Sequence, residues 1–339
     1  MSKKYRAAAL FSGIGGFCLG FGRANISTAW AIENDDYAAT TYRRNLQEAK
    51  LIERNGKPSD IREISTSSHQ LAAMDVFHAG FPCQSFSQAG NRKGFDDDRG
   101  QLFFEVVRIL RELGEDRPKI VVLENSPNLK YGKSGQWFHT VASSLRRAGY
   151  WFRESNCAEL DLYDHSASPQ QRNRLFMVAL ATNRFKNGRF LFPRASQHVA
   201  PKNLEHFIDF QGEKDDSYYL PEQNRYYRMI ASKAKDKQRI YQLRKYTVRV
   251  KDRGVCPTLT ANMGRGGHNV PFVFDAKGLR KLTERECLAL QGFPKDFEFP
   301  DDVPNHARYT QIGNSVSPLV AHCIAQNVSE KLEDAIQYV

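Results

Sequence analysis

The sequence predicts an α/β fold in which helices cover a parallel β-sheet, together with a second, smaller domain. Three observations support this. Short apolar, β-branched runs alternate with helical patterns over about the first 180 residues, a glycine-rich turn follows the first run, and the composition becomes polar after Arg184. We expect a large domain over residues 1–184, a small domain over 185–300, and a C-terminal segment, 301–339, that returns to the large domain.

The large domain shows both periodicities that this fold requires. Strands are expected at residues 7–11, 28–33, 76–80, 120–124 and 175–181. Apolar residues within 102–113 recur at spacings of one, three and four, which predicts a helix lying on the sheet. Residues 135–149 show the same stripe and end at a glycine, so they predict a second helix.

The second half of the chain is less periodic. Residues 184–242 are rich in Lys, Arg, Asn, Gln and Tyr and favour neither helix nor strand, as expected of the smaller domain. Thr283 and Glu286 form a capping box that predicts a helix over 282–290. An amphipathic pattern from about residue 318 predicts a last helix that packs on the large domain.

Composition narrows the class of protein. The 339 residues contain 49 Lys and Arg against 38 Asp and Glu, a formal charge of +11 that favours a polyanionic partner such as nucleic acid. Disorder, collagen and coiled coil are excluded. No apolar stretch of about 18 residues and no signal peptide occur, so we expect a soluble cytoplasmic protein. The six cysteines are too scattered for zinc or a disulfide framework, which predicts reduced thiols and no metal.

The glycine-rich turn indicates a nucleoside site. Gly13, Gly15 and Gly16 lie where the first strand should end and a helix begin, and Glu33 closes the second strand 20 residues after the first glycine. A carboxylate at that distance is typical of ribose recognition. Cys18 occupies the position of the third glycine of the dinucleotide fingerprint, which favours a nucleoside without pyrophosphate. A glycine turn without any ligand is the alternative.

A cysteine is well placed to act as a nucleophile. Cys83 follows Pro82 at the carboxyl end of an expected strand, where open α/β sheets bind their ligands. The polar loop 88–99 after it contains three acidic residues and predicts a mobile lid. The alternative is an inert buried cysteine, the commoner fate of this residue type.

Charged groups that could assist this cysteine end or precede other strands. Glu124 closes a strongly apolar strand, and burying a carboxylate costs several kcal/mol unless it is bonded or protonated. Arg172 and Arg174 are two residues apart and share a strand face if the strand 175–181 begins early. Each arginine could instead be an ordinary surface residue.

These motifs resemble those of DNA (cytosine-5)-methyltransferases of the bacterial restriction-modification type. The resemblance runs from about residue 5 to about 330, with the polar stretch after Arg184 at the place of the family's variable target-recognition domain. The motifs, which occur in the family's order, are Phe-Ser-Gly-Ile-Gly-Gly-Phe from Phe11, Gly-Phe-Pro-Cys-Gln-Ser-Phe-Ser from Gly80, Glu-Asn-Ser-Pro from Glu124, Gln-Arg-Asn-Arg from Gln171, Pro-Thr-Leu-Thr from Pro257 and Gly-Asn-Ser-Val from Gly313.

The resemblance implies a Rossmann-like methyltransferase sheet that binds S-adenosyl-L-methionine, an adenosine compound without pyrophosphate. By the resemblance, Glu33 holds the ribose and Asp60 meets the adenine end. The other cofactor-binding residues that it implies are Phe11, Gly13, Gly15, Gly16, Ile61, Pro82, Leu102, Asn314 and Val316. In this sequence Asn34 stands where several relatives have an aromatic residue against the adenine.

The family's chemistry assigns roles to the catalytic candidates. Cys83 adds to carbon 6 of cytosine, Glu124 with a raised pKa donates at N3, and Arg172 and Arg174 orient the base. The target cytosine must first be flipped out of duplex DNA. Gln84, Ser87 and Arg99 match the part of the family that closes over this base.

DNA contacts are expected in the small domain at Arg249, Lys251, Arg253 and Arg265. We expect double-stranded DNA as the partner, a monomer, no membrane, and a cognate restriction endonuclease without stable contact. Three alternatives stay open. They are a transfer RNA methyltransferase with the same core, a nucleotide-dependent oxidoreductase, and a DNA-binding module without catalysis.

Overall fold

The computed structural model describes residues 5–69, 71–82, 85–86, 94–195, 202–244, 246–265 and 269–335. The chain forms two compact units. Unit 1 consists of Met1–Leu160, Asn173–Arg194 and Val320–Val339, and unit 2 of Asp161–Arg172 and Ala195–Leu319. The predicted fold class, a helix-covered α/β sheet with a smaller second part, is confirmed.

Unit 1 is built on one mixed sheet with the strand order β3-β2-β1-β6-β7-β10-β8, in which β9 also pairs with β10. The neighbours from β3 to β7 run parallel, whereas β10 is antiparallel to β7 and β8. The strands are β1 Tyr5–Leu10, β2 Ile26–Ile32, β3 Lys50–Leu51, β6 Val76–Gly80, β7 Ile120–Asn125, β8 Tyr150–Trp151, β9 Cys157–Asp161 and β10 Asn173–Ala181, with a separate hairpin of β4 Glu53–Arg54 and β5 Lys57–Pro58.

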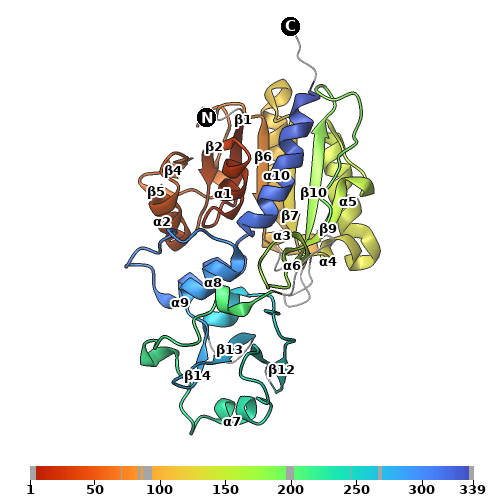
Figure 1. Ribbon diagram of the computed structural model, residues 1–339. Helices are drawn as coiled ribbons and strands as arrows, with labels where there is room; N and C mark the ends of the chain where they lie inside the picture. Colours follow the sequence, from red (N-terminus) through yellow and green to blue (C-terminus); the bar gives the residue numbers. More distant parts are fainter. Residues whose placement is uncertain are drawn as a thin grey trace. The chain divides into compact units, whose positions relative to one another are not determined.

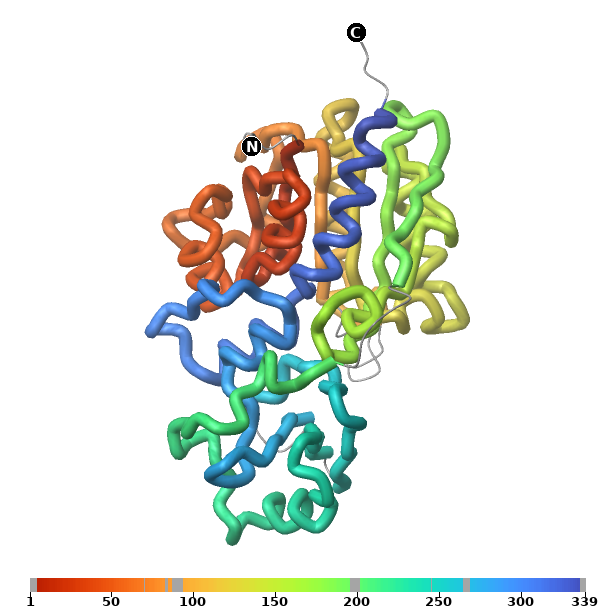
Figure 2. Tube along the Cα trace, viewed as in Figure 1, coloured from red at the N-terminus to blue at the C-terminus, as the bar shows by residue number. Residues whose placement is uncertain are grey.

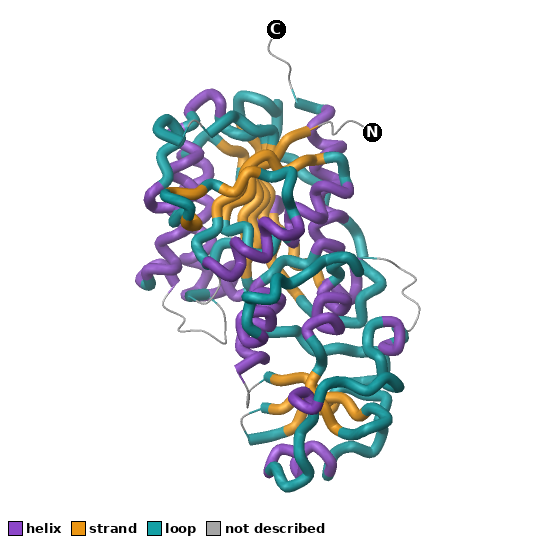
Figure 3. Tube along the Cα trace, turned by 90° about the vertical axis from the view of Figure 1, so that its left-hand side faces the viewer, coloured by secondary structure: helices purple, strands orange, loops and turns teal. Residues whose placement is uncertain are grey.

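Helices cover both faces of this sheet (Figures 1 and 3). Figure 1 shows α1 and α10 in front of it and α3 and α5 behind it. The N-terminal strand and α10 lie side by side (Figure 2), where the Tyr5 hydroxyl donates to Glu333 over 2.8 Å. The helices are α1 Gly16–Arg23, α2 Asp36–Asn45, α3 Asp98–Glu112, α4 Asn128–Tyr131, α5 Gln136–Arg147 and α10 Pro318–Glu333, with short 3-10 turns η1 Ile61–Glu63, η2 Gly94–Asp96, η3 Gly114–Asp116, η4 Gly132–Gly135 and η5 Glu154–Asn156.

The predicted elements of this unit agree with the structure to within a few residues, because each has a buried stripe of its own. The apolar stripe of α3 packs on the sheet through Phe103, Val106 and Leu110, and that of α5 through Val141 and Leu145. One expectation differs. The sheet was predicted to be parallel, but β10 pairs antiparallel with β7, with Leu175 opposite Asn125 and Leu180 opposite Ile120.

Unit 2 is irregular and contains a small antiparallel sheet in the order β12-β11-β13-β14. The predicted capping box is present, since Thr283 and Glu286 exchange both hydrogen bonds at the start of α8. The elements are α6 Leu162–His165, α7 Arg225–Ala231, α8 Glu284–Gln291, α9 Asn305–Asn314, β11 Tyr241–Leu243, β12 Val248–Val250, β13 Val270–Phe274 and β14 Leu279–Lys281, with η6 Leu204–His206, η7 Asp216–Tyr218 and η8 Ala261–Arg265.

A buried arginine connects the segments of unit 2. Arg280 is fully buried, and its guanidinium contacts Asp275 at 2.5 Å and both oxygens of Glu286 at 2.8 Å. It also donates to the backbone carbonyl of Asp209 over 2.7 Å. A buried charge is tolerated only with such partners, so this cluster specifies how β14, α8 and the chain near residue 209 pack.

His78 makes the stability of unit 1 depend on pH. Its ring is buried on β6 and stacks on Phe17 with ring centroids 5.0 Å apart, and burial lowers its pKa to about 3. The unfolded chain binds the proton with a pKa of about 6.5, so it holds more protons than the folded chain between these values. The folded state therefore loses stability as the pH falls below about 6.5.

The unfolding free energy of the wild type is expected to fall between pH 7 and pH 5. We predict that this fall is about 2 kcal/mol smaller in His78→Leu. Urea denaturation at both pH values measures this difference. His139→Gln, which changes an exposed histidine on α5, is the control and should keep the wild-type dependence. An unchanged pH dependence in His78→Leu would contradict the assignment.

Candidate active site

The carboxyl ends of parallel strands β1, β6 and β7 meet at one edge of the unit 1 sheet. Gly80, the last residue of β6, pairs in register with Glu124 near the end of β7, and Leu10 at the end of β1 pairs with Ala79. The motifs that begin at Phe11 and Gly80 therefore both leave the sheet at the edge that carries Glu124.

Glu124 and Arg174 form an ion pair at this edge. The Arg174 Nε lies 3.1 Å from Glu124 Oε1, and Glu124 is only 7% exposed. Antiparallel pairing of β10 with β7 places Phe176 opposite Glu124, so Arg174 falls beside the end of β7. Loss of the guanidinium would leave a buried carboxylate without this partner, which is unfavourable by several kcal/mol.

Two asparagines hold the chain on either side of the expected nucleophile. Buried Asn125 donates its side-chain amide to the Phe81 carbonyl over 3.0 Å, and Asn128 donates to the Phe86 carbonyl over 2.5 Å. Cys83, Gln84 and Ser87 lie outside the described residues. Phe81 and Phe86 flank Cys83 in the sequence, so the two side-chain amides hold the backbone before and after it.

A third set of contacts ties this segment to the start of α3. The Ser85 hydroxyl donates to Asp97 over 2.8 Å, the Gly94 amide donates to the Ser85 carbonyl over 2.8 Å, and Asp97 also caps α3. Sequence reasoning assigned no role to Asn125, Asn128 or Asp97. An amide directly after a strand-ending carboxylate was the available signal for Asn125, whereas the Asn128 and Asp97 contacts depend on the tertiary structure.

The glycine turn leaves room for a ligand. Phe11 has a left-handed backbone with φ of 55°, and Gly13 has φ of 54° with no atom within 4 Å of the place where a Cβ would lie. Gly15, with φ of 85°, precedes the first helical residue, Gly16, and any side chain there would overlap Leu46. Gly13 is thus open toward its surroundings, whereas Gly15 is favoured by its left-handed backbone, which residues with a Cβ rarely adopt.

Glu33 is bonded to this turn. Its carboxylate accepts hydrogen bonds from the backbone amides of Gly13 at 2.7 Å, Asn34 at 3.0 Å and Asp35 at 2.9 Å. Burial raises the pKa of Glu33, against the lowering effect of these amides. Carboxylate oxygens have about four acceptor positions in total, so one remains for a ribose hydroxyl. Open glycine, aromatic Phe11 and acceptor Glu33 fit an adenosine-bearing cofactor.

Asp60 and Ile61 lie at the start of η1 in the same unit. Asp60 receives 3.0 Å and 2.6 Å hydrogen bonds from the Arg62 guanidinium, which lower its pKa, and the Asn34 side chain contributes a further bond. Ile61 is buried in the core, and Leu102 of α3 packs partly buried against that core. Pro82 directly follows the buried Phe81 at the end of β6.

Arg172, Asn314 and Val316 belong to unit 2. Arg172 is 3% exposed and donates to the backbone carbonyls of Leu259 at 2.8 Å, Gly313 at 2.9 Å and Ser315 at 2.7 Å. The two arginines of the Gln-Arg-Asn-Arg motif thus have different partners. Arg172 fixes the backbone on both sides of the exposed Asn314, and buried Val316 lies two residues after Asn314.

The candidate DNA contacts differ in how they are bonded. Arg249 lies exposed on β12 and makes no ion pair with any described residue, whereas Arg253 contacts Asp236 at 2.6 Å. Lys251 donates to the Gln171 side chain over 2.7 Å. Arg99 is exposed in the first turn of α3, and the side chain of Arg265 is not described.

Two further properties concern the described residues only. His, Cys, Asp and Glu side chains nowhere gather there in a group of three or more that could hold a metal ion. Every helix in the described ranges is too short or too polar to cross a lipid bilayer.

Comparison with known proteins decides the family. The model of the C-5 cytosine-specific DNA methylase family matches residues 5–330. The chain belongs to this family. The family and the enzyme class predicted from the motifs, a DNA (cytosine-5)-methyltransferase, are confirmed, and the oxidoreductase alternative is wrong.

Relatives of this cytosine methylase cover nearly its whole length. The type II methyltransferase M.Bsp6I of Bacillus sp. (strain RFL6) is 37% identical over 96% of this chain and 98% of its own, and M1.ScrFI of Lactococcus lactis subsp. cremoris is 33% identical over 97% and 79%. Entamoeba histolytica methyltransferase EhMeth is similar in structure, with a TM-score of 0.72 and 19% identity over 98% of this chain and 99% of its own.

We predict that Asn125→Ala lowers the methylation rate at least tenfold while the chain stays folded. The substitution removes the bond to the Phe81 carbonyl and leaves a buried acceptor unsatisfied, which costs about 1–3 kcal/mol. Single-turnover methylation and urea denaturation measure the two effects. Asn45→Ala, which removes another amide-to-carbonyl bond, at the end of α2, is the control and should leave the rate near wild type. Wild-type turnover in Asn125→Ala would show that this anchor is dispensable.

Proposed function

We propose that this chain is a site-specific DNA methyltransferase that modifies cytosine at carbon 5 with a methyl group from S-adenosyl-L-methionine, as the modification half of a restriction-modification system. The relatives M.Bsp6I and M1.ScrFI are type II methyltransferases, and the formal charge of +11 suits a nucleic acid. The observation that carries the proposal is the Glu124–Arg174 pair, at the sheet edge where the chain continues into Pro82 and Cys83.

The proposed mechanism begins with Cys83. Its thiolate adds to carbon 6 of cytosine, and the electron pair of the 5,6 double bond makes carbon 5 nucleophilic. Glu124 donates a proton at N3, which lowers the energy of the addition, while Arg174 holds the Glu124 carboxyl and offers guanidinium hydrogens to the base carbonyl. S-adenosyl-L-methionine, when bound, supplies the methyl group for carbon 5. A base then takes the carbon 5 proton, the Cys83 sulfur leaves as thiolate, and the added N3 proton returns to Glu124.

The remaining cofactor roles come from the resemblance to the family, and the local structure supports those of Glu33 and Gly13. Glu33 is assigned to the ribose hydroxyls, Asp60 and Ile61 to the adenine end, and the open side of Gly13 to close approach of the ligand. Pro82, Leu102, Asn314 and Val316 complete the proposed set. Arg172 acts by fixing the backbone around Asn314, because its terminal nitrogens are bonded to carbonyls there.

DNA recognition is assigned chiefly to the small domain. Because a stacked cytosine hides carbon 6, the base must be flipped out at a cost of a few kcal/mol that protein contacts offset. Gln84, Ser87 and Arg99 are proposed to close over it. Arg249, Arg253 and Arg265 are proposed to contact the duplex. One set of catalytic residues per chain makes a monomer sufficient.

Methyl transfer tests the reaction. Labelled S-adenosyl-L-methionine is supplied with unmethylated bacterial DNA and, separately, with bulk transfer RNA, and the labelled nucleosides are analysed. We predict 5-methylcytosine in DNA alone, and none with Cys83→Ser, which should still bind the cofactor because it changes only the nucleophile. Label in RNA alone would contradict DNA as the substrate, and turnover by Cys83→Ser would remove the nucleophile assignment.

Salt dependence tests the proposed DNA contacts. Each phosphate neutralised contributes about −0.9 to the slope of log affinity against log salt. Arg249→Ala should reduce the magnitude of this slope by about 0.9, whereas Arg253→Ala should reduce it less, since Arg253 is already paired with Asp236. Fluorescence anisotropy with duplex DNA at several salt concentrations measures both. Equal slopes in wild type and Arg249→Ala would exclude that contact.

A further inference from the structure

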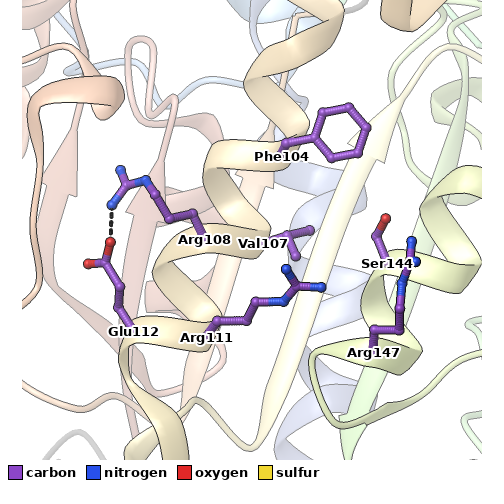
Figure 4. A pocket seen from close by; sticks show the side chains of 7 residues that line it. All are labelled: Phe104, Val107, Arg108, Arg111, Glu112, Ser144 and Arg147. Carbon is purple, nitrogen blue, oxygen red and sulfur yellow. Dashed lines mark hydrogen bonds and ion pairs between the residues drawn. The ribbon is translucent and has the colours of Figure 1, made fainter.

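A groove lined by three arginines lies between helices α3 and α5 of unit 1. It has a volume of about 520 Å³, within the range of small-molecule sites. None of its residues belongs to the proposed cofactor, base or DNA contacts. Its lining consists of Phe104, Val107, Arg108, Arg111, Glu112, Ser144 and Arg147 (Figure 4).

Two of the three arginines that line the groove form no ion pair with another described residue. Arg108 is neutralised by Glu105 at 2.7 Å and by Glu112, and it donates to the Ile61 carbonyl. Arg111 and Arg147 are exposed and make no ion pair with another described residue. Figure 4 shows Arg108 turned toward Glu112, while Arg111 extends toward the side of the groove that carries Ser144 and Arg147.

Neutral groups line the rest of the groove. Val107 is almost fully buried, and Phe104 is partly exposed, with its ring 5.2 Å from that of Phe95. Ser144 adds a hydroxyl between the two helices, which can donate to an anion. The groove therefore combines two guanidinium groups and a hydroxyl with an apolar and aromatic surface.

We propose that this groove binds a nucleoside monophosphate at a site separate from the methyl-transfer site. Arg111 and Arg147 hold the phosphate dianion, Ser144 donates to it, and the nucleoside lies against Val107 and Phe104. Guanidinium groups bind phosphate oxygens through paired, charge-assisted hydrogen bonds. An arginine in the last turn of a helix is favourable because it interacts with the helix dipole. The dipole does not explain why arginines from two different helices line one groove.

The charges around the groove favour a single phosphate over duplex DNA. Glu112 lines it, and the chain that leaves α3 continues with exposed Glu115 and Asp116. Duplex DNA presents a row of phosphates, which requires a continuous strip of basic side chains on the protein. The carboxylates of Glu112, Glu115 and Asp116 interrupt such a strip here.

Titration calorimetry of the full-length chain tests the proposal. The probe is uridine 5′-monophosphate, because its base differs from the adenine of the cofactor. Uridine and inorganic phosphate, the two parts of this molecule, are titrated separately for comparison. We expect the monophosphate to bind more tightly than either part. Arg111→Gln and Arg147→Gln should each weaken it about tenfold or more. Arg146→Gln changes the neighbouring exposed arginine, which does not line the groove, and should weaken it less than twofold.

Three results would overturn the proposal. The first is equal affinity for uridine and uridine 5′-monophosphate, and the second is an equal loss of affinity in Arg146→Gln and Arg147→Gln. The third is displacement of the monophosphate by duplex DNA that depends on Arg111, which would make the groove a nucleic-acid contact. Methylation of DNA is measured in parallel and should stay at the wild-type rate in all three variants. Failure of the methyltransferase proposal is thus distinguishable from failure of this one.

Discussion

The ion pair between Glu124 and Arg174 is the interaction on which the candidate active site depends. A carboxylate that is 7% exposed at the end of an apolar strand needs a cation close by, and Arg174 provides it at 3.1 Å. The pair exists because β10 runs antiparallel to β7, which places the first residues of one strand beside the last residues of the other. A parallel β10 would have placed Arg174 at the opposite edge of the sheet.

Hydrogen bonds to backbone carbonyls extend the same principle along the chain. Asn125 and Asn128 fix Phe81 and Phe86, which flank Cys83, and Arg172 fixes Gly313 and Ser315, which flank Asn314. In each case a polar side chain constrains the neighbours of a proposed functional residue rather than contacting a ligand itself. Such contacts lower the entropy cost of ordering the site, so we expect catalysis to be sensitive to residues that take no part in the chemistry.

Unit 2 shows how a segment with weak periodicity still acquires a defined structure. Its sheet strands are three to five residues long, and buried Arg280 links Asp275, Glu286 and the Asp209 carbonyl. The Thr283–Glu286 capping box was visible in the sequence because a cap is a local pattern of fixed spacing. That Glu286 also neutralises Arg280 was not visible, since nothing in the sequence marks Arg280 as buried.

The sequence by itself determined the main strands and helices of unit 1, the helix α8 of unit 2, and the family of this protein. Strand and helix positions follow from local periodicity, the turn from Gly13 and Gly15, and the family from six ordered motifs that match over residues 5–330. Only the tertiary structure decided the direction of β10, the different partners of Arg172 and Arg174, the amide anchors around Cys83, and the convergence of Arg111 and Arg147. The physical reason is that these contacts join residues far apart in the chain, and local periodicity carries no information about which distant groups packing will bring together.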